Sequence, residues 1–130
     1  MKNKKVYILH DRAILYVTGE DSREFLQNLI SNDINKLSET NSSFASLLTA
    51  QGKFLYEFMI IQHKSGFLID CEKSQVDGLY KQLSLYKLRS KVEILNLSNE
   101  FVVAAFSYEK FLTFDKAHDI NGFTLKFRED

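Results

Sequence analysis

Two stretches of the chain carry hydrophobic residues at the 3.6-residue period of an amphipathic helix. The first begins at Asp21, an expected N-cap with Glu24 at capping-box spacing, and its apolar positions are Phe25, Leu26, Leu29 and Ile30. The second begins at Ser74, an expected N-cap with Asp77 three residues later, and its apolar positions are Val76, Leu79, Tyr80, Leu83 and Tyr86. The pattern therefore predicts two main helices, with one further helical turn over residues 34–37.

Between these helices and around them, short apolar and β-branched runs bounded by turn residues predict strands. The middle runs form a meander, with Gly52 and Gly66 at its two turns, and the first two runs predict a hairpin turned at Asp11 and Arg12. The expected strands are residues 5–10, 13–18, 43–49, 54–62, 67–71, 91–97, 101–107, 111–114 and 122–127. Strands joined as hairpins beside two helices indicate an α+β fold with a largely antiparallel sheet.

Length and charge limit the class of protein. The chain has 130 residues and 45% hydrophobic residues, enough for one domain over residues 1–130 with its own core. Lys plus Arg and Asp plus Glu number 17 each, so no basic surface argues for a direct nucleic-acid partner. The apolar run at residues 6–9 is too short for a signal peptide, and no stretch has the roughly 20 apolar residues of a membrane helix. We therefore expect a cytoplasmic protein without a membrane partner.

Few side chains indicate metal or nucleophilic chemistry. His10, His63 and His118 lie in unrelated segments, so no metal site is predicted and the three are assigned to surface positions near turns. Cys71 ends an apolar strand, where a lone cysteine is usually a small buried hydrophobic residue, with a nucleophile as the less frequent alternative. Gly-x-Gly-x-x-Gly, P-loop and Gly-x-Ser-x-Gly motifs do not occur in the sequence, which removes the main support for dinucleotide enzymes, NTPases and α/β hydrolases.

Glu57 is the one charged residue within the apolar strand expected at residues 54–62. By alternation it shares a face with Leu55 and Met59, whereas Tyr56 lies on the other face with Phe54. Neither face is otherwise polar, which favours a carboxylate that faces a pocket and holds a proton beside an amine-bearing ligand. The alternative is a carboxylate that points to solvent from a half-buried strand.

Three ordered segments resemble motifs of the YgfZ-type folate-binding proteins. Residues 19–34 resemble G-x-D-x-x-x-F-L-Q-x-L-x-T/S-N-D-I, residues 47–55 resemble L-L-T-P-Q-G-K-x-L, and residues 85–92 resemble x-Y-x-L-R-x-K-V. The family is related to the glycine-cleavage T-protein, an aminomethyltransferase, and its YgfZ branch is associated with tetrahydrofolate-dependent assembly or repair of iron–sulfur enzymes and with tRNA modification. The resemblance implies a ferredoxin-like α+β arrangement and tetrahydrofolate as the cofactor.

The same resemblance implies a folate-binding site. The T-protein pattern Y-x-L-L-L-x-x-x-G-x-x-x-D-D places its aromatic residue on Phe44, its glycine on Gly52, and its two aspartates on Tyr56 and Glu57. It implies Phe44 as an aromatic wall for the pterin, Glu57 as a carboxylate beside the pterin nitrogens, and Tyr56 as a member of the same site. Because Tyr56 replaces one acid, the resemblance also implies that aminomethyl transfer is not retained, and no catalytic residue is assigned.

Asn32 and Asp33 belong to the first of the three motifs. The resemblance implies that both line the folate cavity. The alternative is that both form the turn that ends the first helix.

Three functions are expected as alternatives. The first is a tetrahydrofolate-binding module that acts in iron–sulfur protein assembly or repair or in tRNA modification, with iron–sulfur proteins as partners. The second is a folate-dependent aminomethyl or one-carbon transferase, so whether the protein is an enzyme stays open. The third is a structural half, because the family's K-G-C-Y/F-x-G-Q-E segment is not reached by residue 130 and Cys71 is not its cysteine. Such a half would form a homo-oligomer or need a separate C-terminal chain.

Overall fold

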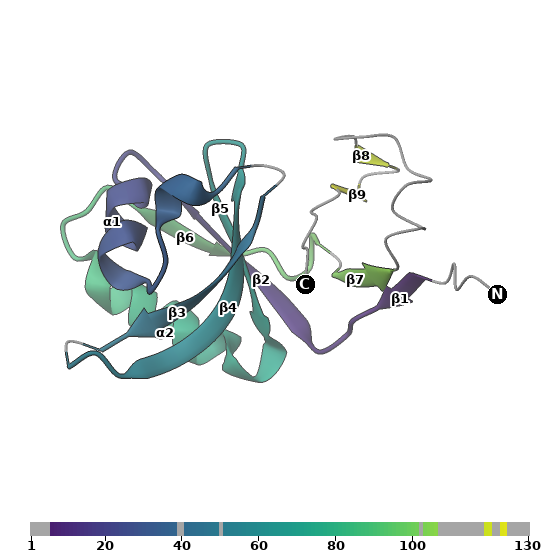
Figure 1. Ribbon diagram of the computed structural model, residues 1–130, viewed down its shortest axis with the longest axis horizontal. Helices are drawn as coiled ribbons and strands as arrows, with labels where there is room; N and C mark the ends of the chain where they lie inside the picture. Colours follow the sequence, from purple (N-terminus) through teal and green to yellow (C-terminus); the bar gives the residue numbers. More distant parts are fainter. Residues whose placement is uncertain are drawn as a thin grey trace.

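A five-stranded sheet forms the centre of the protein in its computed structural model, which describes residues 6–38, 41–49, 51–101, 103–106, 119–120 and 123–124. The strand order is β3-β4-β5-β2-β6, and every pairing is antiparallel. These strands are β2 (Arg12–Thr18), β3 (Ser43–Leu48), β4 (Phe54–His63), β5 (Gly66–Glu72) and β6 (Glu93–Asn96). Helices α1 (Ser22–Leu29) and α2 (Val76–Lys87) pack on one face of the sheet (Figure 1). The expected α+β class is confirmed.

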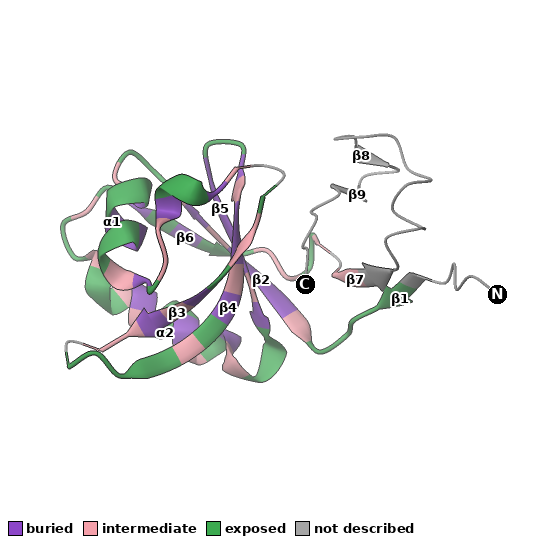
Figure 2. Ribbon diagram, in the orientation of Figure 1, coloured by how far each residue is buried: buried purple, intermediate pink, exposed green. Residues whose placement is uncertain are grey.

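The hydrophobic core lies between the sheet and the two helices (Figure 2). Leu15, Ile60 and Ile69 come from three different strands, and they share one buried cluster with Leu26 of α1 and Leu79 of α2. Because side chains alternate along a strand, the residues between these core positions lie on the opposite, outer face of the sheet. This outer face carries Phe44 of β3 and Glu57 of β4, two of the residues expected to bind folate.

Part of the outer face is covered by the chain itself. Ile14, Ile61 and Leu68 of β2, β4 and β5 are buried there. The residues packed against them are Tyr16, Leu97, Phe101 and Val103. The part of the outer face formed by β3 and the first half of β4 carries exposed side chains instead.

Glycines at two turns have positive φ angles. Gly52, with φ +82°, makes the expected turn between β3 and β4. Gly19, with φ +120°, joins β2 to α1, and a Cβ atom there would lie 2.3 Å from the carbonyl oxygen of Lys91. The glycine of the first family motif is therefore required both by its backbone angle and by the close approach of the segment that leads to β6.

Some expected pairings and element starts are wrong. The first two strands do not form a hairpin: β1 (Val6–Ile8) pairs with β7 (Ala104–Phe106), while β2 lies between β5 and β6. Leu9 donates a hydrogen bond to the carbonyl of Val103, 2.8 Å away, which directs the chain out of the central sheet. Ser74 is not an N-cap, because it lies inside the 3-10 helix η2 (Lys73–Gln75) that precedes α2.

The order β2-α1-β3-β4-β5-α2-β6 has one strand more than the β-α-β-β-α-β order of a ferredoxin-like fold. The additional strand arises because β3, β4 and β5 form a three-stranded meander between the helices. The expected extra turn is the 3-10 helix η1 (Ile34–Lys36). The expected strand at 111–114 lies outside the described residues, and the one at 122–127 is described only at β9 (Phe123–Thr124), which pairs with β8 (Asp119–Ile120).

Candidate functional site

Phe44 and Glu57 lie on the same outer face of the sheet. In the register of β3 and β4, Phe44 is opposite Met59 and Ser46 is opposite Glu57. Phe44 and Glu57 are therefore diagonal neighbours, a relation in which the Cα atoms are about 7–8 Å apart. Phe44 is 49% exposed, and Glu57 is also exposed. An aromatic ring and a carboxylate are thus presented side by side to solvent.

A charged pair lies next to these residues on the same face. Met59 of β4 is opposite Asp70 of β5, so the row that begins at Phe44 continues to Asp70. The Nε of Arg12 donates to the Asp70 carboxylate at 2.8 Å, and its Nη2 donates to the Asp70 carbonyl at 3.0 Å. This part of the face therefore combines an aromatic ring, a thioether, a carboxylate and an ion pair.

Asn32 and Asp33 border the face at the outer edge of β3, where Ile30 bridges to Leu47. The Asn32 side-chain amide donates to the carbonyl of Phe44 at 3.0 Å, and its oxygen accepts from the backbone N–H of Asp33 at 2.8 Å. The Asp33 carboxylate accepts from the backbone N–H of Asn35 at 3.0 Å, at the start of η1. The structure thus brings Asn32 beside the backbone of Phe44, and it gives both residues hydrogen bonds that hold the chain after α1 against the sheet edge.

Tyr56 lies on the opposite face of the sheet from Phe44 and Glu57. It is paired with Leu47 and packs against the core under the helices. A Cβ atom at Gly78 of α2 would lie 2.4 Å from the Tyr56 hydroxyl oxygen, so that glycine makes room for the tyrosine. The sheet itself therefore separates Tyr56 from the other expected folate residues.

The pocket-facing position favoured for Glu57 by the sequence pattern is not what the structure shows. Its side chain is exposed, as in the solvent-facing alternative. The predicted alternation holds from Tyr56 to Met59, since Glu57 and Met59 share one face and Tyr56 lies on the other. It does not extend to Phe54, because the register shifts beyond Leu47 and Leu48 is opposite Phe54. The covering residues Phe101 and Val103 pack over β2, β5 and the end of β4, which leaves the face around Glu57 open.

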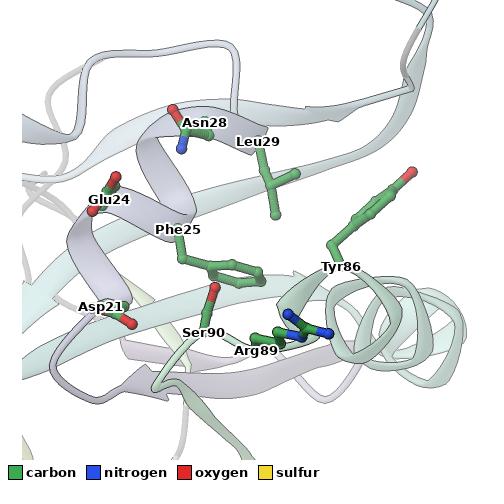
Figure 3. A pocket seen from close by; sticks show the side chains of 8 residues that line it. All are labelled: Asp21, Glu24, Phe25, Asn28, Leu29, Tyr86, Arg89 and Ser90. Carbon is green, nitrogen blue, oxygen red and sulfur yellow. The ribbon is translucent and has the colours of Figure 1, made fainter.

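A groove of about 360 Å³ lies elsewhere, between α1 and the C-terminal end of α2 (Figure 3). Its lining residues are Asp21, Glu24, Phe25, Asn28, Leu29, Tyr86, Arg89 and Ser90. All eight belong to the first and third family-like motifs, and none is among the five expected folate residues. The sequence did not predict this groove. The signal that could have found it is that residues 19–34 and 85–92, which supply its lining, both match family motifs.

Cys71 and His63 are both buried. The Cys71 thiol is free, and its pKa is raised to about 11, first by burial and then by the neighbouring Asp70 carboxylate. A raised pKa makes the thiol a poor nucleophile near neutral pH. His63 was expected at the surface, but it follows Ile61 on the outer face and its ring contacts those of Tyr16 and Phe101 edge-on.

Within the described residues, no group of three or more His, Cys, Asp or Glu side chains is placed to hold a metal ion. His118 lies outside those residues. None of the helices described is long and apolar enough to cross a membrane.

Comparison with known proteins gives the same family as the three motifs. No family model matches the chain. It is 33% identical over 99 residues to the mitochondrial iron–sulfur cluster assembly factor IBA57 homolog of Neurospora crassa, a match that covers 71% of this chain and 23% of that protein. Human mitochondrial IBA57 is 32% identical over 99 residues, which cover 66% of this chain and 28% of the human protein. The tRNA-modifying protein YgfZ of Aliivibrio fischeri is 26% identical over 110 residues, which cover 85% of this chain and 34% of that protein.

A solved structure supports the fold. The glycine cleavage system aminomethyltransferase T from Bartonella henselae superposes with a TM-score of 0.65 at 15% identity, over 72% of this chain and 26% of that protein. The chain thus spans between about a quarter and a third of the length of these proteins.

The cytoplasmic location expected from the sequence is contradicted. The IBA57 relatives, including those of Neurospora crassa and human, are named as mitochondrial proteins. The expectation rested on the lack of a signal-peptide pattern and of a membrane helix, and neither observation distinguishes the cytoplasm from another compartment. By its motifs, its fold and its relatives, the chain belongs to the family that includes the YgfZ and IBA57 proteins and shares the fold of the glycine-cleavage T-protein.

Proposed function

We propose that the protein binds tetrahydrofolate on the open outer face of β3 and β4 and acts in the assembly or repair of iron–sulfur proteins. One observation carries the proposal: Phe44 and Glu57, the positions at which the T-protein pattern has an aromatic residue and an acid, are diagonal neighbours on one exposed face. The names of the relatives support the cellular role, since the IBA57 proteins are named as iron–sulfur cluster assembly factors.

The side chains on this face suit a pterin in their chemistry. An exposed phenylalanine offers a flat apolar surface on which an aromatic ring can stack. The Glu57 carboxylate is an acceptor for the N–H groups of such a ring, and hydrogen bonds to an ionised acceptor are stronger than neutral ones. Asn32 sets the position of Phe44 through its hydrogen bond to the Phe44 carbonyl. We propose Asp33 as a border of the same site, while Tyr56 would act only indirectly because it lies beneath the sheet.

Calorimetric titration of reduced tetrahydrofolate under anaerobic conditions tests the site. We expect a Kd in the micromolar range, about −8 kcal/mol, and at least a tenfold weakening in Phe44→Ala and in Glu57→Gln, about 1.4 kcal/mol each. Both side chains are exposed, so neither substitution is expected to disturb the fold.

Matched controls lie away from this face. Tyr80→Ala removes an aromatic ring that is 40% exposed on α2, and Glu93→Gln neutralises an exposed acid on β6. Both should bind as wild type. Equal affinity in wild type, Phe44→Ala and Glu57→Gln would place the ligand elsewhere. No heat at millimolar ligand would refute folate binding by this chain.

Iron–sulfur proteins are the proposed partners. In cells that lack the chain, we expect lower activity of iron–sulfur enzymes at unchanged enzyme abundance, restored by wild type and not by Phe44→Ala. A tRNA-modifying role, as the name of the YgfZ relative states for that protein, would instead change tRNA nucleoside composition with iron–sulfur enzymes unaffected.

A further inference from the structure

The groove between α1 and the end of α2 has opposite charges on its two sides (Figure 3). Glu24 of α1 lies on one side of the Phe25 ring, and Arg89, just after α2, lies on the other. Phe25 and Leu29 contribute apolar surface between them. Within the part of the chain that the structure describes, neither the Glu24 carboxylate nor the Arg89 guanidinium has a hydrogen bond or an ion pair.

Large apolar side chains are exposed at the same end of α2. Leu85 is 60% exposed and Leu88 is 84% exposed, while Tyr86 lines the groove itself. Leu88 has φ +37°, an angle that is unfavourable for a residue with a Cβ atom. The fold thus keeps a leucine in solvent at a strained backbone position, and both strain and clustered exposed apolar side chains are typical of functional surfaces.

We infer that a second copy of this chain docks on this face and forms a two-fold symmetric dimer. In a two-fold interface both copies use the same surface, so every contact between two different residues occurs twice, once in each direction. A two-fold axis through the groove therefore places Glu24 of each copy opposite Arg89 of the other. Both charges are paired by the same operation, so this groove is complementary to itself.

The apolar side chains fit the same arrangement. The axis also brings Leu88 of each copy toward the apolar floor of the other copy's groove, where Phe25 and Leu29 lie. Burial of Leu88 would remove the most exposed of the large apolar side chains described from water. The patch is small compared with stable obligate interfaces, so the expected dimer has a micromolar Kd.

Sedimentation velocity over protein concentrations from about 1 to about 100 µM tests the inference. Wild type should approach twice the chain mass of 15.1 kDa as concentration rises. Arg89→Glu places an acid opposite Glu24 at both contacts, and Glu24→Arg places two bases together, so each variant alone should raise the Kd at least tenfold. Lys81→Glu reverses an exposed charge on α2 outside the groove and should leave the dimer unchanged.

Mixing the two variants separates charge pairing from damage to the fold. An equimolar mixture of Arg89→Glu with Glu24→Arg restores an opposite pair at both contacts, so it should form a dimer although neither variant does so alone. Leu88→Gly, which has no Cβ atom to strain at this positive φ angle, should weaken the dimer without lowering stability. Wild type that remains monomeric at every concentration, or a mixture that fails to dimerise, would overturn the inference and leave the face to a different polypeptide.

Discussion

Cys71 shows how its surroundings determine the chemistry of one residue. The thiol is fully buried beside Asp70, and its pKa is raised from 9.0 to about 11. Burial raises this pKa most, because it disfavours the charged thiolate, and the Asp70 carboxylate adds repulsion. Below pH 9 the thiol is protonated in both the folded and the unfolded chain, so it costs no stability there. Between pH 9 and about 11 the unfolded chain loses the proton first, and the folded state is destabilised.

We therefore expect the free energy of unfolding to fall more steeply between pH 9 and about 11 in wild type than in Cys71→Ala. A difference of about two pKa units sets an upper limit of about 3 kcal/mol on this effect. Urea unfolding followed by circular dichroism measures it, and every other ionisable group is present in both proteins. Near pH 8 the variant should be less stable by about 1–2 kcal/mol, because the removed sulfur leaves a cavity. Parallel pH profiles would show that the thiol does not titrate as described.

Single residues on the sheet also show what sequence reasoning could and could not establish. Alternation alone placed Glu57 and Met59 on one face and Tyr56 on the other, because the side-chain period of a strand is a local property. Alternation does not say which face is covered. That depends on where the helices and Phe101 pack, and these come from distant parts of the chain. The exposure of Glu57 could therefore not be predicted from its own strand.

At the scale of elements, both main helices were predictable because burying one side of a helix produces a local hydrophobic period. The partner of β1 was not predictable in this way. Val6 pairs with Phe106, so the contact joins two segments far apart in the sequence, and nothing in the first two apolar runs distinguishes this pairing from a hairpin. The groove was missed for the same reason, since Phe25 and Tyr86 meet only in the fold.

At the start of α1, the predicted N-cap residue is correct, but the expected capping hydrogen bond is not formed. Asp21 is the N-cap residue, as its spacing from Glu24 predicts, but its side chain makes no capping hydrogen bond. Its carboxylate instead accepts from the backbone N–H of Lys91 at 2.8 Å, and its own N–H donates to the Lys91 carbonyl at 3.1 Å. Asp21 therefore ties the start of α1 to the segment that leads into β6.

We expect Asp21→Ala to lower the free energy of unfolding by about 1–3 kcal/mol, because the N–H of Lys91 loses a charged acceptor. Asp21→Asn keeps an oxygen acceptor and should lose less. Urea unfolding of both variants measures the difference, and hydrogen exchange at the Lys91 amide should rise in Asp21→Ala. Equal losses in the two variants would mean that the charge, and not the hydrogen bond to Lys91, carries the effect.

At the scale of the whole molecule, the outer face of the sheet has a covered part and an open part. Phe101 lies over Ile14, Ile61 and Leu68, and its ring contacts that of His63 with centroids 5.8 Å apart. Phe44 lies on the open part, 49% exposed. Two phenylalanines on one face thus have different surroundings, so their removal should affect different properties of the protein.

Phe101→Ala should lower the free energy of unfolding by about 2–4 kcal/mol, because it uncovers buried side chains of β2, β4 and β5, and it should leave tetrahydrofolate binding unchanged. Phe44→Ala should change stability by less than about 1 kcal/mol and should lose the ligand. Urea unfolding and calorimetric titration of the same two samples measure both properties. Each variant serves as the control for the other, because both remove one phenylalanine ring from the same side of the sheet. If folded Phe101→Ala lost tetrahydrofolate while Phe44→Ala kept it, the ligand would belong on the covered part of the face, and the assignment of Phe44 and Glu57 would be wrong.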